Sequence, residues 1–182
     1  QGFQLSFSNG DHKIRSLGVM PSSGRVAVDL SDKDGLDPYS LKAKFIRLPA
    51  VGPSRIAANT QCSGRCAIAI NKARPDEEFV LQGFRFKRAS GESNVRQIGV
   101  RPNAASGVVE VVFADNGSFP YAAEVRYAFA PKTAFQRVGT TTRSHDGKAE
   151  VPVNGILARV TGSAGMSILQ GFDFRFDNGD HH

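Results

Sequence analysis

The chain has 182 residues, 40% hydrophobic and 22% charged, a globular composition that excludes disordered and fibrous proteins. No apolar run reaches the roughly 18–20 residues that a membrane helix needs, so no membrane span is expected. Lys and Arg outnumber Asp and Glu by 23 to 17, which gives a net charge of +6. The basic residues recur at every second position of strand-like runs. This spacing is typical of the solvated face of a sheet, and a nucleic-acid-binding surface is the alternative.

Apolar and polar residues alternate along most of the chain, a period of two that predicts β-strands with one buried face. Turn-forming stretches rich in Gly, Asn, Asp and Ser separate these strands, and no stretch shows a sustained helical period. Six or seven strands are expected in each half, which suits an antiparallel β-sandwich. The alternating apolar positions are, in chain order, Phe3, Leu5 and Phe7; Val26, Val28 and Leu30; Leu41, Ala43 and Phe45; and Phe172, Phe174 and Phe176.

Three carboxylates lie close together in the first half of the chain, at Asp32, Asp34 and Asp37 around Gly35. Carboxylate oxygens at this density could hold Ca²⁺, although the spacing is not that of an EF-hand loop. A β-turn uses the same residue types for backbone reasons, and the turn is the preferred interpretation. We therefore keep a Ca²⁺ site as the alternative and expect no other cofactor.

The chain has two cysteines, Cys62 and Cys66, and no second Cys or His pair completes a zinc site. One interpretation is a pair of small buried thiols. The residues between them, Ser63-Gly64-Arg65, are typical of a tight hairpin turn, which would place the two sulfurs opposite each other. We therefore predict a Cys62–Cys66 disulfide. A disulfide implies an oxidising compartment, so the expected location is extracellular, cell-surface or periplasmic.

An internal repeat runs through the whole chain. Residues 2–21 align with residues 83–102 without a gap, and seven of the twenty positions are identical. The alignment continues with small insertions and pairs Pro38 with Pro120. Residues 171–182 then align with the start of the chain at seven of twelve identical positions, so a third copy begins there.

This repeat of about 81 to 88 residues predicts two tandem antiparallel β-sandwich units, at residues 1–82 and 83–170, followed by a closing strand within 171–182. Residues 171–177 are expected to pair within a sheet, because exposed Phe side chains on one strand would promote aggregation. The unfilled edge of that strand could pair with the N-terminal unit of a neighbouring chain. The residues expected to be buried are Phe3, Val26, Val28 and Phe45 and, in the second copy, Phe84, Val109, Val111 and Tyr127.

The two ends of the chain leave a second interpretation of the repeat open. Gln1 rather than Met begins the sequence, and no charged segment followed by an apolar one precedes the first strand, which indicates a mature or excised form. The alternative to a closing strand is therefore that the chain is cut from a longer array of repeats.

Catalytic patterns are weak in this sequence. The histidines are His12, His145, His181 and His182, all in turn-like stretches, and no GxSxG elbow is present. Because no nucleophile, base and orienting group form a set, we expect a protein that is not an enzyme.

The sequence therefore predicts a non-catalytic protein from outside the cytoplasm, an adhesin-like, carbohydrate-binding or self-assembling structural β protein. Its expected partners are other copies of itself or extracellular glycans and proteins. The alternative is an accessory β module of a carbohydrate-active or other hydrolytic enzyme, stabilised by Ca²⁺. A basic nucleic-acid-binding protein is the third hypothesis; exposed aromatic residues among basic ones, which such a protein needs, are scarce.

Overall fold

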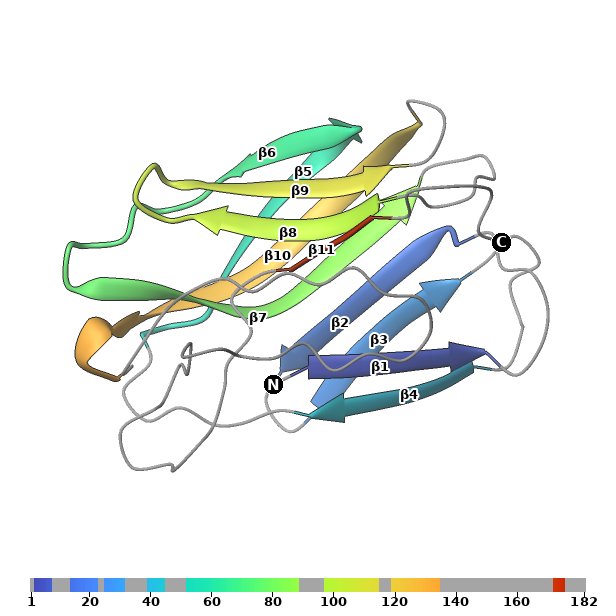
Figure 1. Cartoon of the computed structure of the whole chain (residues 1–182), viewed down its shortest axis with the longest axis horizontal. Helices are drawn as coiled ribbons and strands as arrows, with labels where there is room; N and C mark the ends of the chain where they lie inside the picture. The colour runs from blue at the N-terminus through green and yellow to red at the C-terminus, as the bar shows by residue number, and fades with distance from the viewer. Residues whose placement is uncertain are drawn as a thin grey trace.

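The structure is a computed structural model that describes residues 2–7, 14–22, 25–31, 39–44, 52–88, 97–114, 119–134 and 172–175. In these ranges the regular elements are β-strands, apart from the short 3₁₀ turn η1 (Lys132–Ala134), so the predicted all-β class is confirmed (Figure 1). The strands are β1 (Gly2–Phe7), β2 (Ser16–Ser22), β3 (Arg25–Ser31), β4 (Tyr39–Lys44), β5 (Arg55–Ser63), β6 (Arg65–Ala69), β7 (Glu77–Arg88), β8 (Gln97–Asn103), β9 (Val108–Ala114), β10 (Pro120–Pro131) and β11 (Phe172–Arg175).

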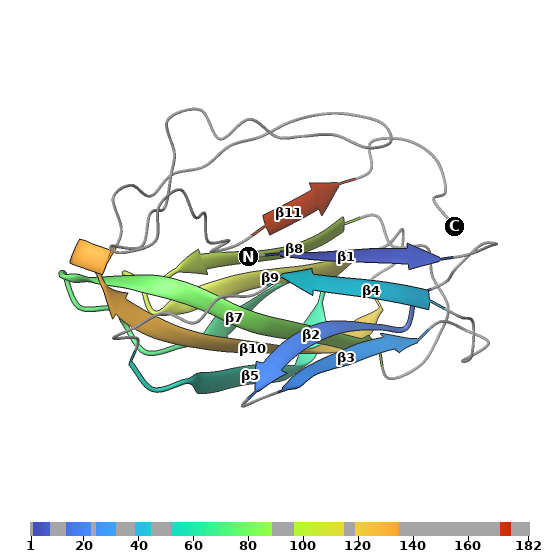
Figure 2. The same ribbon diagram turned by 90° about the horizontal axis from the view of Figure 1, so that it is seen from below.

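The strands form two large antiparallel sheets and one two-stranded ladder. Sheet I has five strands in the order β3-β2-β7-β10-β5, and sheet II has four in the order β11-β8-β9-β6. The ladder pairs β1 with β4. Figure 2 shows β8 and β9 of sheet II as a layer over β7 and β10 of sheet I. The described strands therefore form a sandwich of two sheets, with the β1–β4 ladder beside it.

The core lies between these two sheets and draws side chains from both. Phe86 of β7 stacks on Phe113 of β9 with ring centroids 5.4 Å apart, which joins sheet I to sheet II. One contiguous cluster of buried residues fills the space between the sheets, as expected for a single domain core. Its members are Leu17, Cys62, Ile68, Phe79, Leu81, Phe84, Phe86, Val100, Val109, Val111, Phe113, Tyr121, Ala123, Val125, Tyr127 and Phe129.

Strand β7 is interrupted by a bulge, and both of its halves bury side chains in the core. Its pairing with β10 shifts by one residue between Arg126 and Tyr127, which leaves Gln82 as the extra residue of β7. A bulge changes the side-chain alternation by one position. Consequently the odd-numbered Phe79 before the bulge and the even-numbered Phe84 after it are both buried.

The internal repeat reappears strand by strand in the pairing registers. In the first copy Ser16 of β2 lies opposite Ser31 of β3. In the second copy Gln97 of β8 lies opposite Ala114 of β9. The sequence alignment places Ser16 on Gln97 and Ser31 on Ala114, so the two hairpins share one register.

The prediction of two separate sandwiches, at 1–82 and 83–170, is not confirmed. The predicted boundary falls at the bulge inside β7, and strands of the two copies pair with each other. Strand β6 of the first copy pairs with β9 of the second, β5 with β10, and β2 with the second half of β7. The copies are therefore interleaved in the described part of the fold, because a strand that starts one copy pairs with strands of both copies.

Burial agrees with the sequence where side chains are described. Phe84, Val109, Val111 and Tyr127 are buried as predicted. The matching positions of the first copy, Phe3, Val26, Val28 and Phe45, lie outside the residues whose side chains the structure describes. The predicted pairing of the closing strand is confirmed over residues 172–175, because β11 runs antiparallel to β8 (Figure 1).

Candidate functional site: the disulfide corner and the strand edges

The chain passes from sheet I to sheet II at Gly64, between the two cysteines. Gly64 has a φ of +57°, a left-handed conformation that glycine adopts without a steric penalty, so the turn between β5 and β6 is tight. The predicted disulfide joins Cys62 to Cys66, whose Cα atoms are 5.3 Å apart. The expected hairpin is corrected in one respect. Strands β5 and β6 are not paired with each other, because each is the edge strand of a different sheet.

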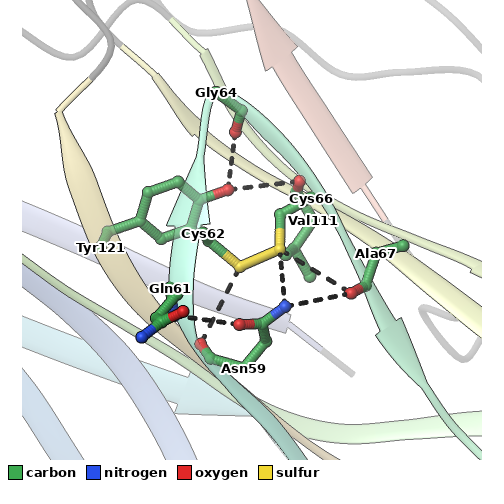
Figure 3. The surroundings of a disulfide bond; sticks show 8 residues. All are labelled: Asn59, Gln61, Cys62, Gly64, Cys66, Ala67, Val111 and Tyr121. Atoms are coloured by element: carbon green, nitrogen blue, oxygen red, sulfur yellow. Dashed lines mark hydrogen bonds between the residues drawn. A yellow bond between two sulfur atoms is a disulfide. The ribbon is translucent and has the colours of Figure 1, made fainter.

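The disulfide therefore joins the two sheets at one corner of the sandwich. The two cysteines are only four positions apart, so the loop-entropy contribution to stability is small. Asn59 of β5 adds polar contacts across the same corner (Figure 3). Its side-chain amide donates to the Cys66 sulfur at 3.3 Å, and its side-chain oxygen accepts a hydrogen bond from the backbone N–H of Gln61 at 2.9 Å. This local network fixes the geometry of the crossing.

Tyr121 of β10 holds the turn from inside the sandwich. Its hydroxyl donates to the Gly64 carbonyl oxygen at 2.7 Å, and the Val111 carbonyl lies 3.4 Å away (Figure 3). Burial raises the pKa of Tyr121 from 10.0 to about 12, because the ionised form would lose its hydration. Sequence reasoning missed this role, although the Pro120-Tyr121 pair was visible as a repeat of Pro38-Tyr39.

We expect Tyr121→Phe to lower the free energy of unfolding at neutral pH by about 0.5–1.5 kcal/mol, because the Gly64 carbonyl loses its donor. The stabilising effect of the raised pKa is complete below about pH 10 and is lost as the pH rises to about 12. The wild-type protein should therefore lose its advantage over the variant between these values. Urea unfolding of both proteins from pH 8 to pH 12 measures this difference, and a difference independent of pH would contradict the prediction.

A row of polar side chains crosses four neighbouring strands of sheet I, β3, β2, β7 and β10. The Ser16 hydroxyl donates to an Asp29 carboxylate oxygen at 2.6 Å, and the Arg85 guanidinium lies 3.3 Å from the other oxygen. Arg85 also approaches Glu124 of β10 at 3.9 Å. Because these charged side chains are about one-third exposed, the pairs contribute little stability, typically about 0–1 kcal/mol each. Their effect is to align neighbouring strands.

A second arginine, Arg88, lies inside the sandwich. Arg88 ends β7 and is 5% exposed, with its guanidinium carbon 4.7 Å from the centre of the Phe113 ring and 5.9 Å from that of Phe119. Such cation–π contacts stabilise a buried guanidinium. The two arginines of residues 84–88 (FRFKR) therefore lie on different faces, Arg85 on the outer face and Arg88 in the core. The sequence had predicted that basic residues in such runs lie on the solvated face.

The predicted Ca²⁺ ligands Asp32, Asp34 and Asp37 lie outside the described residues, as do the four histidines. The described ranges contain no group of three or more His, Cys, Asp or Glu residues that could hold a metal ion. Nor do those ranges contain a helix long and apolar enough to cross a membrane. Comparison with known proteins finds no matching family model, no similar curated protein and no similar solved structure.

The strand edges are the remaining candidate for function. Each repeat copy begins with a strand of the pattern Gly-Phe-x-Phe or Gly-Phe-x-Leu, which we call a joint strand: β1, residues 83–88 of β7, and β11. The joint strand in β7 has a neighbour on each side, β2 and β10. Among the described strands, β1 is paired only with β4, and β11 only with β8. Two of the three joint strands therefore have one edge without a described partner.

Proposed function

We propose that this chain is a non-catalytic, extracytoplasmic structural protein that binds other copies of itself through the edges of its sheets. The single observation that supports this proposal is the unequal pairing of the joint strands. The one in β7 has two neighbours, whereas β1 and β11 each have one among the strands that are described. An edge strand presents a row of backbone donors and acceptors that can pair with a strand of another chain.

The location outside the cytoplasm is proposed from the Cys62–Cys66 disulfide, which is compatible with an oxidising compartment. The non-catalytic role is proposed from what the described polar groups do. Asp29, Arg85 and Glu124 are engaged in contacts between strands, and the Tyr121 hydroxyl is engaged with the Gly64 carbonyl. These contacts support the fold and leave the sheet edges as the candidate binding surfaces.

The purified chain should form oligomers whose average mass rises with protein concentration. Light scattering coupled to size-exclusion chromatography measures this mass, and dilution should reverse the change. A monomer at all concentrations would contradict the proposed self-association. If that monomer bound sugars on a glycan array, the carbohydrate-binding hypothesis would replace the proposal. Binding to DNA with a steep dependence on salt would favour the nucleic-acid hypothesis.

A further inference from the structure

We infer that copies of this chain assemble head to tail by strand exchange. In the assembly, β1 of a second copy takes the place of β11 on the edge of β8. This inference rests on the proposed self-association and specifies its geometry. It follows from the repeat, because equivalent strands pair in identical registers wherever both partners are described.

The first matching pair of registers concerns β8. Within the chain, β2 pairs with the joint strand of the next copy, and Ser16 lies opposite Lys87. The equivalent pairing in the following copy is that of β8 with β11, where Gln97 lies opposite Arg175. The repeat alignment carries Ser16 onto Gln97 and Lys87 onto Arg175, so the two ladders are the same. Strand β8 therefore presents an edge for a joint strand.

The second matching pair concerns β1. In the ladder, Phe3 of β1 lies opposite Ala43 of β4. In sheet I, Phe84 of β7 lies opposite Val125 of β10. The alignment carries Phe3 onto Phe84 and Ala43 onto Val125, so the β1–β4 ladder reproduces half of the environment of β7. Among the described strands, β1 has no neighbour on its other side, where the joint strand of β7 has β2. The strand of the second repeat copy that is equivalent to β2 is β8.

Strands β1 and β8 therefore have complementary edges. Sheet I contains the four neighbouring strands β3-β2-β7-β10. The repeat makes β9 and β8 equivalent to β3 and β2, and β1 and β4 equivalent to β7 and β10. Two chains can therefore form the same order, with β9-β8 of one chain followed by β1-β4 of the next. In that arrangement β1 would have two neighbours, as residues 83–88 of β7 have. The assembly needs no new type of contact, because each pairing in it already exists once inside the chain.

Glycine positions in the accepting strands are consistent with this arrangement. A Cβ atom on Gly18 of β2 would lie 3.1 Å from the Cα atom of Arg85 in β7, so the joint strand approaches closely there. Gly99 holds the same position in β8, opposite Asp173 of β11. Glycine thus stands at the equivalent point of both edges that pair with a joint strand.

Strand β11 and an incoming β1 compete for the same edge of β8. Residues 2–7 and 171–176 share Gly-Phe at their start and Phe at their end, and either can place Phe opposite Val100 in the shared register. Strand exchange of this kind replaces an intramolecular pairing with an equivalent intermolecular one. Because the contact is head to tail, each added chain leaves a β8 edge available for the next, and the product is an open chain of subunits.

Engineered disulfides in the full-length chain test this inference, since directly opposite residues in a ladder have Cα atoms about 4.5–5.5 Å apart, within disulfide range. The shared register places Ser6 of one chain opposite Gln97 of the next. The Ser6→Cys, Gln97→Cys variant, unfolded in urea and refolded at high concentration under mild oxidation, should give a ladder of covalent dimers, trimers and larger species on non-reducing gels. The single Gln97→Cys variant should give at most dimers.

The matched control fixes β11 on its own β8. The Gln97→Cys, Arg175→Cys variant should form one intramolecular bond, remain monomeric in sedimentation experiments, and lose the self-association of the parent chain. If this locked variant assembles as the parent does, strand exchange is wrong, although self-association by another surface stands. If Ser6→Cys, Gln97→Cys yields only monomers, internally cross-linked or not, the inference is likewise overturned. If no variant and no parent chain associates, the proposed function fails with it.

Discussion

Replacement of Phe86 by alanine is expected to lower the free energy of unfolding by about 3–5 kcal/mol. Phe86 lies in β7, the strand at the centre of sheet I, and is 0% exposed. Its ring stacks on Phe113 of sheet II and meets the edge of Tyr121 with centroids 6.1 Å apart. Truncation would remove these contacts and leave a cavity between the sheets. Urea unfolding followed by circular dichroism and by tyrosine fluorescence measures the loss.

The matched control is Ile56→Ala in β5, a large apolar side chain that is 55% exposed. Surface substitutions of this kind usually change stability by about 0.5 kcal/mol or less. Because small domains have about 5–15 kcal/mol of stability in total, the Phe86 variant should be close to unfolding at elevated temperature. Equal effects of the two substitutions would mean that the sheets are not packed on Phe86.

The features predicted correctly from the sequence depend on short-range patterns. Alternation with a period of two shows which residues share one face of a strand, so the burial of Phe84, Val109 and Tyr127 could be predicted from neighbouring residues alone. The three residues between the cysteines made a tight turn recognisable, and with it the disulfide. The pairing of residues 172–175 followed from the apolar positions of that segment.

Which strands pair with each other could not be predicted in the same way. A repeat in the sequence has the same pattern whether each copy folds by itself or exchanges strands with the next copy. The bulge at Gln82 has no sequence signature either, yet it decides that both halves of β7 face one core. Tyr121 was missed for a related reason. Its hydroxyl contacts Gly64, 57 positions away, through the packing of the two sheets.

Separating the chain at the repeat boundary is expected to abolish folding of both pieces. A fragment of residues 1–82 would end at the bulge of β7. In it, β5 would lose its partner β10, β6 would lose β9, and β2 would lose residues 83–88 of β7. The buried Ile68 and Leu81 would lose the opposing sheet strands that cover them. The remaining fragment, 83–182, would lack β2, β3, β5 and β6 and would expose the other side of the same core.

Circular dichroism and urea titration of each fragment should therefore show no cooperative transition, whereas a mixture of the two refolded together should recover one. Recovery is expected because the interrupted backbone bond is at the bulge, where the ladder with β10 is already broken, and the pairings on either side of it can re-form. An insertion of Gly and Ser residues between Ala105 and Ser106, in the turn joining β8 to β9, is the control and should leave folding intact. A cooperative transition in residues 1–82 alone would restore the prediction of two independent sandwiches. It would also remove the basis for strand exchange between chains, because each copy would then be complete without the joint strand of the next.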